Sequence, residues 1–199
     1  MKADDLIDTL IESALNEVRS RHQEATKEYQ REIAQQIAVG ALRYFMLRFT
    51  RTTVIAFDFQ EALSFEGETG PYIQYASVRA RNILRKLEER GESLPDFDKV
   101  LDAGALARQL GNDDFWQMLF QASLCDWNIE KAIASGEPAQ LARFAFQLAQ
   151  SFNNFYHHYH ILNETDSERK AFLLWMTTFF LRELTGVLDI MGIPAPEVM

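Results

Sequence analysis

The sequence predicts an all-α protein that contains one short extended segment. Apolar residues recur every three or four positions over several long stretches, which is the spacing of helices with one buried face. Glycine and proline fall between these stretches, where helices begin and end. Only residues 50–59 combine β-branched and aromatic side chains in the way that favours extended backbone.

The first half of the chain contains three of the predicted long helices, over residues 2–24, 27–49 and 71–90, and a short helix over residues 60–67. The second of these helices has small residues at 34, 38, 40 and 41, which let a neighbouring helix approach closely. The third begins at Pro71, which suits a first helical turn, and ends before Gly91, which suits a C-terminal cap.

The second half begins with the best candidate linker, residues 91–111, which hold several glycines, one proline and scattered acidic residues. Thr165 and Glu168 have the spacing of a capping box at the start of the last helix. Gly192 and Pro194 end that helix. The predicted helices of this half cover 98–109, 112–126, 128–134, 138–161 and 166–190.

The totals describe an ordinary globular chain. Its 199 residues are enough for one or two domains, and the net charge of -9 argues against general affinity for nucleic acids without excluding a local basic face. The one cysteine, Cys125, is expected to be a buried thiol and cannot form an internal disulfide. No signal peptide is recognisable, and the most apolar run, residues 171–181, is shorter than a membrane span. We therefore expect a soluble, cytoplasmic protein.

The stretch 70-GPYIQYASVRAR-81 places two tyrosines and an arginine together on one flank of a helix. At 100° per residue, Tyr72, Tyr75 and Arg79 lie beside the apolar face, whereas Arg81 and Arg85 point away from it. One interpretation is that the tyrosines seal a helix interface. The other is that a ring with one exposed edge stacks on a nucleobase while the arginine meets a base or a phosphate.

A second cluster, 152-FNNFYHHYH-160, holds three of the four histidines. His157 and His160 lie one turn apart, but no cysteine or well-placed acid completes a metal site. Tyr156 and His160 share a side of the predicted helix, which is either a packed helix end or a further polar and aromatic contact surface. The ending 192-GIPAPEVM-199 is either a frayed terminus or an ordered tail.

Sequence signatures of catalysis are absent: the chain has no phosphate loop, no dinucleotide-binding glycine pattern and no nucleophile elbow. Its acidic residues are spread over helix surfaces, which solvation explains. The residues alone thus leave three functions open: a nucleic-acid-binding module, a helical protein-interaction bundle, and a small metalloenzyme built on residues 157–160.

Four segments resemble the C-terminal part of the bacterial-type arginyl-tRNA synthetase family, which belongs to class I of these ligases. They are 35-QQIAVGALRYFML-47, 57-FDFQEALSFEGETGPYIQYASVRARNILRK-86, 141-LARFAFQLAQSFNNFYHHYHIL-162 and 192-GIPAPEVM-199. The resemblance implies an all-helical anticodon-binding bundle of the DALR type over residues 27–199. It also implies that residues 1–26 pack on a catalytic domain that is not part of this sequence.

The resemblance further implies the partners and the site. The HIGH and KMSKR signatures and the Rossmann core are absent, so the chain is not expected to act alone as an arginine–tRNA ligase. ATP and magnesium would belong to the full enzyme, and no cofactor or metal is expected in this part. The expected partners are tRNA(Arg) and the catalytic domain, with no DNA or membrane and a monomeric state. The implied anticodon contacts are Tyr72, Tyr75, Arg79, Tyr156, His160 and Met199, and the implied contacts to the tRNA backbone are Arg81, Arg85 and Lys86.

Overall fold

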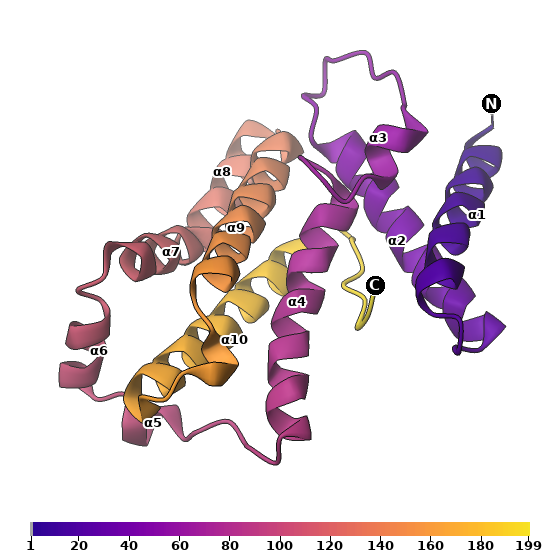
Figure 1. Cartoon of the computed structure of the whole chain (residues 1–199). Coiled ribbons are helices and arrows are strands. Elements are labelled where there is room, and N and C mark those ends of the chain that lie inside the picture. Colours follow the sequence, from indigo (N-terminus) through magenta and orange to yellow (C-terminus); the bar gives the residue numbers. More distant parts are fainter. Residues whose placement is uncertain (1) are drawn as a thin grey trace.

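The structure, a computed structural model, describes residues 2–199, and within this range all regular secondary structure is helical, with no strand (Figure 1). The all-α prediction is therefore confirmed. The helices are α1 (Ala3–Arg21), α2 (Lys27–Leu47), α3 (Phe59–Leu63), α4 (Gly70–Glu89), α5 (Phe97–Val100), α6 (Ala103–Gln109), α7 (Asp113–Ser123), α8 (Cys125–Ser135), α9 (Pro138–His158), the 3-10 turn η1 (Ile161–Asn163) and α10 (Ser167–Ile190).

Helix α4 lies at the centre of the arrangement. The α1–α2 hairpin packs on one side of it, and α9 and α10 pack on the other, with α7 and α8 beyond them (Figure 1). Helices α5 and α6 pack on α10. The segment predicted as a linker, residues 91–111, is thus part of the bundle, and its Leu101 and Ala105 are buried in the main core.

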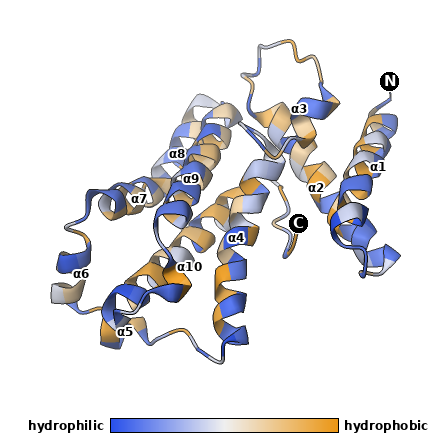
Figure 2. Ribbon diagram, viewed as in Figure 1, coloured by the Kyte–Doolittle hydropathy of each residue, from blue (hydrophilic) through white to orange (hydrophobic). Residues whose placement is uncertain are grey.

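The main core forms where α4, α9 and α10 meet. Phe152 of α9 stacks on Phe180 of α10 with ring centroids 4.0 Å apart, and both side chains are fully buried. Figure 2 shows hydrophobic residues along the inner sides of these helices and hydrophilic residues on much of the outside. Burial of these large aromatic side chains is the main source of stability for the three-helix unit.

Helix α10 is longer than the apolar run that the sequence shows. Its 24 residues are long and apolar enough, by length and composition, to cross a membrane, and 56% of its most apolar window is buried inside the protein. Phe172, Phe180 and Leu184 are among the fully buried side chains of the core. This packing is typical of a helix in the core of a bundle.

Helices α2 and α4 approach each other closely, as the small residues of α2 predict. A β-carbon added to Gly70 would overlap the carbonyl group of Gly40, so the two backbones are in direct contact there. Beside this contact, the fully buried Gln74 donates from Nε2 to the carbonyl oxygens of Gln36 (2.9 Å) and Pro194 (2.8 Å). One side chain therefore joins α4, α2 and the C-terminal tail.

Several predicted helix ends were wrong. Helix α9 ends at His158 and not at residue 161, because Tyr159 has extended backbone angles (φ -118, ψ 119). The N-cap of α10 is Asp166 and not Thr165: the carboxylate of Asp166 accepts a hydrogen bond from the backbone N–H of Arg169 (2.9 Å). At α4, by contrast, Gly91 (φ 74) forms the expected C-terminal cap.

The segment 50–59 is irregular until α3 begins at Phe59, which agrees with the predicted extended insertion. Its apolar side chains pack against α2 and hold the segment against the helix. The ring of Phe57 packs on Phe45 of α2 with centroids 4.7 Å apart, and Ile55 adds to the same cluster. Val54 at the tip is 95% exposed.

Candidate nucleic-acid interface

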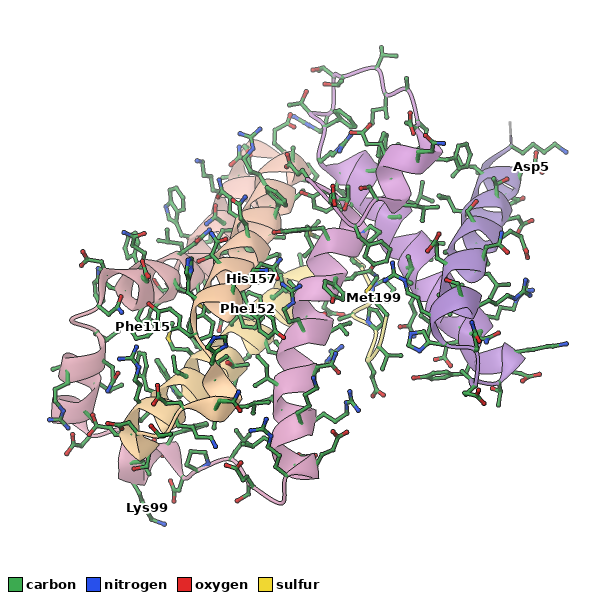
Figure 3. The ribbon with its side chains drawn as sticks, in the orientation of Figure 1. Asp5, Lys99, Phe115, Phe152, His157 and Met199 are labelled. Atoms are coloured by element: carbon green, nitrogen blue, oxygen red, sulfur yellow. The ribbon has the colours of Figure 1, made fainter. Side chains whose placement is uncertain are left out.

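A groove of about 510 Å³ lies between one side of α4, the end of α9 and the turn η1. It is the place where the two clusters predicted from the sequence meet. Figure 3 shows His157 at this side of α4, with Met199 on the other side. The groove is lined by Tyr75, Arg79, Asn82, Ile83, Lys86, Arg90, Tyr156, His157, Tyr159, His160, Ile161, Leu162 and Asn163.

One wall of the groove is a polar stripe along α4. Tyr75, Arg79, Asn82, Lys86 and Arg90 follow each other at steps of three or four residues, so they lie on the same side of the helix. Thr69 begins this helix by accepting a hydrogen bond from the backbone N–H of Tyr72 (3.2 Å). Because Thr69 sets the first residue of α4, it also sets which side chains of the helix face the groove and which face the core.

Arg79 connects this wall to α9. Its guanidinium lies over the ring of Tyr75 (4.8 Å to the centroid) and over the ring of Tyr156 (4.7 Å). Its Nη1 donates to Oδ1 of Asn153 at 2.5 Å, and Asn153 is only 7% exposed. Arg79 is thus held by two aromatic rings and one buried acceptor, and it in turn fixes the separation of the two tyrosines.

The two predicted tyrosines of α4 have different surroundings. Tyr75 lines the groove and meets the edge of Phe65 with ring centroids 6.3 Å apart. Tyr72 packs against Phe146 of α9 (5.4 Å) at the margin of the main core and is not among the residues that line the groove. The geometry therefore favours ring stacking by Tyr75 and helix packing by Tyr72.

The groove is positively charged in an otherwise acidic protein. Among residues 2–199, no aspartate or glutamate lines it, whereas Arg79, Lys86 and Arg90 do. Arg90 is partly held in place, because Nη1 donates to the carbonyl oxygen of Leu162 (2.7 Å). Burial is the main cause of the raised pKa of Tyr159, whose hydroxyl donates a hydrogen bond to Oδ2 of Asp114 (3.0 Å).

The remaining predicted cations have other partners. The side chain of Arg81, which the helical spacing places away from the core, is half-buried, and its Nη1 donates to the carbonyl oxygens of Ala195 (2.6 Å) and Pro196 (2.7 Å). Arg81 therefore holds the C-terminal tail. Arg85 is exposed and forms an ion pair with Glu89 (2.8 Å). Of the three predicted backbone contacts, Lys86 alone lines the groove.

The C-terminal tail is ordered and docked, not frayed. Met199 and Val198 pack against the apolar seam of the α1–α2 hairpin, which includes Leu15 and Ile37. Met199 therefore lies away from the residues that line the groove. His160 lines the groove, but it follows the end of α9 and does not extend the helical side that carries Tyr156.

The histidine cluster has no metal-binding geometry in the part of the chain that the structure describes. Residues 2–199 contain no group of three or more His, Cys, Asp or Glu side chains that could hold a metal ion. Nδ1 of His158 lies 2.9 Å from the carbonyl oxygen of Asn154, whereas His157 and His160 line the groove. Aromatic rings, cations and amides suit the binding of RNA bases and phosphates better than acid–base or metal chemistry.

Comparison with known proteins agrees with this assignment. Residues 73–199 match the model of the DALR anticodon binding domain, and the chain belongs to this family of tRNA-synthetase domains. The relatives are arginine–tRNA ligases: that of Methanothrix thermoacetophila is 34% identical over all 199 residues, which make up 34% of it. That of Streptococcus pneumoniae is 34% identical over 169 residues, which are 84% of this chain and 28% of the relative.

The fold gives the same result. The structure of Thermus thermophilus arginyl-tRNA synthetase superposes on the whole chain with a TM-score of 0.82 and 30% identity, and the match covers 32% of that protein. The chain thus spans about a third of the length of the relatives that it matches. The predicted fold class and family are confirmed: the chain belongs to the DALR anticodon binding domain family and is similar over its whole length to one part of arginyl-tRNA synthetases.

Some lining residues were not predicted. Asn82 and Arg90 continue the α4 stripe at helical spacing from Tyr75 and Arg79, so their position beside the groove could have been predicted from the sequence. Tyr159, which lines the groove, and Asn153, which holds Arg79 from beneath it, could not be placed in this way. Their contribution depends on how α9 is rotated and where it ends.

Proposed function

We propose that this chain binds the anticodon loop of tRNA(Arg) in the groove between α4 and α9, as part of a cytoplasmic arginine–tRNA ligase. The observation that supports this most strongly is the arrangement of Tyr75, Arg79 and Tyr156 at the edge of a groove that carries cations and no carboxylate among the described residues. An unstacked base can lie on an exposed tyrosine face, and such stacking contributes about 1–3 kcal/mol per base. Lys86 can neutralise a phosphate next to it.

In this proposal, residues 1–26 pack on the catalytic domain of the same enzyme, which supplies ATP and magnesium chemistry. The protein works as a monomer, without DNA or a membrane as partner. Relatives about three times as long as this chain support the presence of that catalytic part in the working enzyme. The chain itself carries no cofactor and contributes recognition and positioning of the tRNA.

The test is a fluorescence anisotropy titration of the chain with tRNA(Arg), next to the same tRNA with a changed middle anticodon base. Preferential binding of the unchanged tRNA is the expected result. Equal binding would contradict base recognition by this chain, and absent binding would contradict the groove as a sufficient binding site.

A second candidate function is binding of a protein partner without tRNA specificity. Exposed apolar side chains on α7 and α8 favour it, since Trp116, Phe120 and Trp127 are each more than half exposed. Absence of tRNA binding, together with a defined protein complex that Trp116→Ser abolishes, would favour this second function.

A further inference from the structure

The outer face of α9 carries a continuous stripe of uncharged and basic polar residues. Arg143, Gln147, Gln150, Asn154 and His157 are all exposed and follow each other at steps of four and three residues, so they form one line along the helix. From the first to the last of them, the line is about 21 Å long, at 1.5 Å per residue.

This stripe is unusual for the molecule because α9 contains no aspartate or glutamate. The chain has 29 acidic residues, and each of the other long helices, α1, α2, α4 and α10, carries at least two of them. The absence of carboxylates therefore sets the exposed side of α9 apart from the exposed sides of the other long helices. A helix that lies against a polyanion has a physical reason to lack carboxylates, since each carboxylate would repel the phosphates.

The stripe joins two hollows in the surface. At its C-terminal end, His157 lines the groove described above. At its N-terminal end, Arg143 and Gln147 line a second hollow of about 330 Å³, together with Lys131 of α8. The acid in this hollow, Glu137, is paired with Arg51 (3.1 Å), so its charge is compensated.

We propose that the outer face of α9 binds the sugar-phosphate backbone of a double-stranded RNA stem. This inference rests on the proposed function, because the stem is the one that closes the loop held in the groove. Amide side chains donate hydrogen bonds to phosphate oxygens and accept them from 2′-hydroxyl groups, independently of sequence. Arg143 and Lys131 supply positive charge at the far end of the line.

The variant Gln147→Glu/Gln150→Glu tests this role. It adds two carboxylates to the stripe without changing side-chain size, and glutamate and glutamine have similar helix propensities, so the fold is expected to persist. The matched control is Gln23→Glu/Gln35→Glu, which makes the same change of charge at exposed positions of the α1–α2 hairpin. Circular dichroism checks that both variants are folded.

Two RNA probes are titrated by fluorescence anisotropy at one salt concentration: a hairpin with the anticodon stem and loop, and the loop sequence alone as a single strand. We expect Gln147→Glu/Gln150→Glu to weaken hairpin binding about fivefold, while single-strand binding changes less than about twofold. The control variant should leave both within about twofold. Arg143→Gln should lower the salt dependence of hairpin binding by about one ion, with no change for the single strand.

The outcomes separate the two proposals. An unchanged hairpin affinity, equal losses for hairpin and single strand, or an equal effect of the control variant would overturn the role of α9 while the groove stays a binding site. Failure of the unmodified chain to bind either probe would overturn the proposed function and this inference together.

Discussion

The two sides of α4 use polar side chains in opposite ways. On the side of α2, Nε2 of Gln74 and Nη1 of Arg81 donate to backbone carbonyl groups of α2 and the C-terminal tail, and Gly70 touches the backbone of Gly40. On the side of α9, Tyr75 and Lys86 border an open groove. Helix α4 thus has a closed side, which packs on α2 and the C-terminal tail, and an open side, which borders the groove. The packing of the closed side holds the helix, and with it the groove residues, in position.

The largest expected effect comes from breaking the closed side at its tightest point. Gly70→Ala should lower the free energy of unfolding by about 3 kcal/mol, because the new β-carbon would overlap the backbone of Gly40 and the helices would have to separate. Urea denaturation measures this. Gly186→Ala is the control: nothing lies within 4 Å of its added β-carbon, so its stability should stay equal or rise slightly. Equal losses for the two variants would contradict the close contact.

A smaller effect is expected from Arg81→Ala. Loss of two hydrogen bonds from a charged donor should lower the free energy of unfolding by about 2 kcal/mol and release the tail. Carboxypeptidase should then remove Met199 faster. Arg85→Ala, which breaks an exposed ion pair, should change stability by less than about 0.5 kcal/mol and leave the rate of digestion unchanged. Similar digestion of both variants would contradict the proposed hold on the tail.

On the open side, Tyr75→Ala should weaken tRNA(Arg) binding about tenfold, or about 1.4 kcal/mol, because a stacking surface is lost. The helical fold should remain, as circular dichroism can show. Tyr29→Ala serves as the control, since Tyr29 is a tyrosine of α2 that is 39% exposed. An unchanged affinity of the Tyr75 variant would rule out stacking on this ring.

The smallest expected effect tests Asn153, which touches the open side only through Arg79. Asn153→Ala should weaken tRNA binding about fivefold, because the guanidinium loses its buried acceptor and no longer fixes the two tyrosines. In a double-mutant cycle with Arg79→Ala, the second substitution should add less than about twofold. Fully additive losses would show that Asn153 acts independently of Arg79.

Features with local signals could be predicted from the sequence. The start of α4 depends on neighbouring residues, Gly70 and Pro71, and its end on Gly91, whose positive φ the cap requires. The family-specific tyrosine and arginine pattern on the same helix identified Tyr75 and Arg79 as groove residues. The close approach of α2 was likewise readable from Gly40 and its small neighbours.

Features that depend on distant contacts could not be predicted. The partners of Arg81 lie more than 110 residues away in sequence, so helical spacing alone made it look solvent-exposed. No glycine or proline marks the end of α9. The predicted helix therefore continued to residue 161 and wrongly included His160, which follows the end of α9. At the start of α10, both Thr165 and Asp166 are good capping residues, and the structure selects Asp166.

The contact between Gly40 and Gly70 also has a mechanical meaning. Packed helices usually absorb small displacements through rotamer changes of the side chains between them. Between Gly40 and Gly70 the two backbones touch directly, so no rotamer change at this contact can absorb such a displacement. We therefore expect the α1–α2 hairpin and the first turns of α4 to move as one rigid unit, so that a displacement of the hairpin also displaces Tyr75.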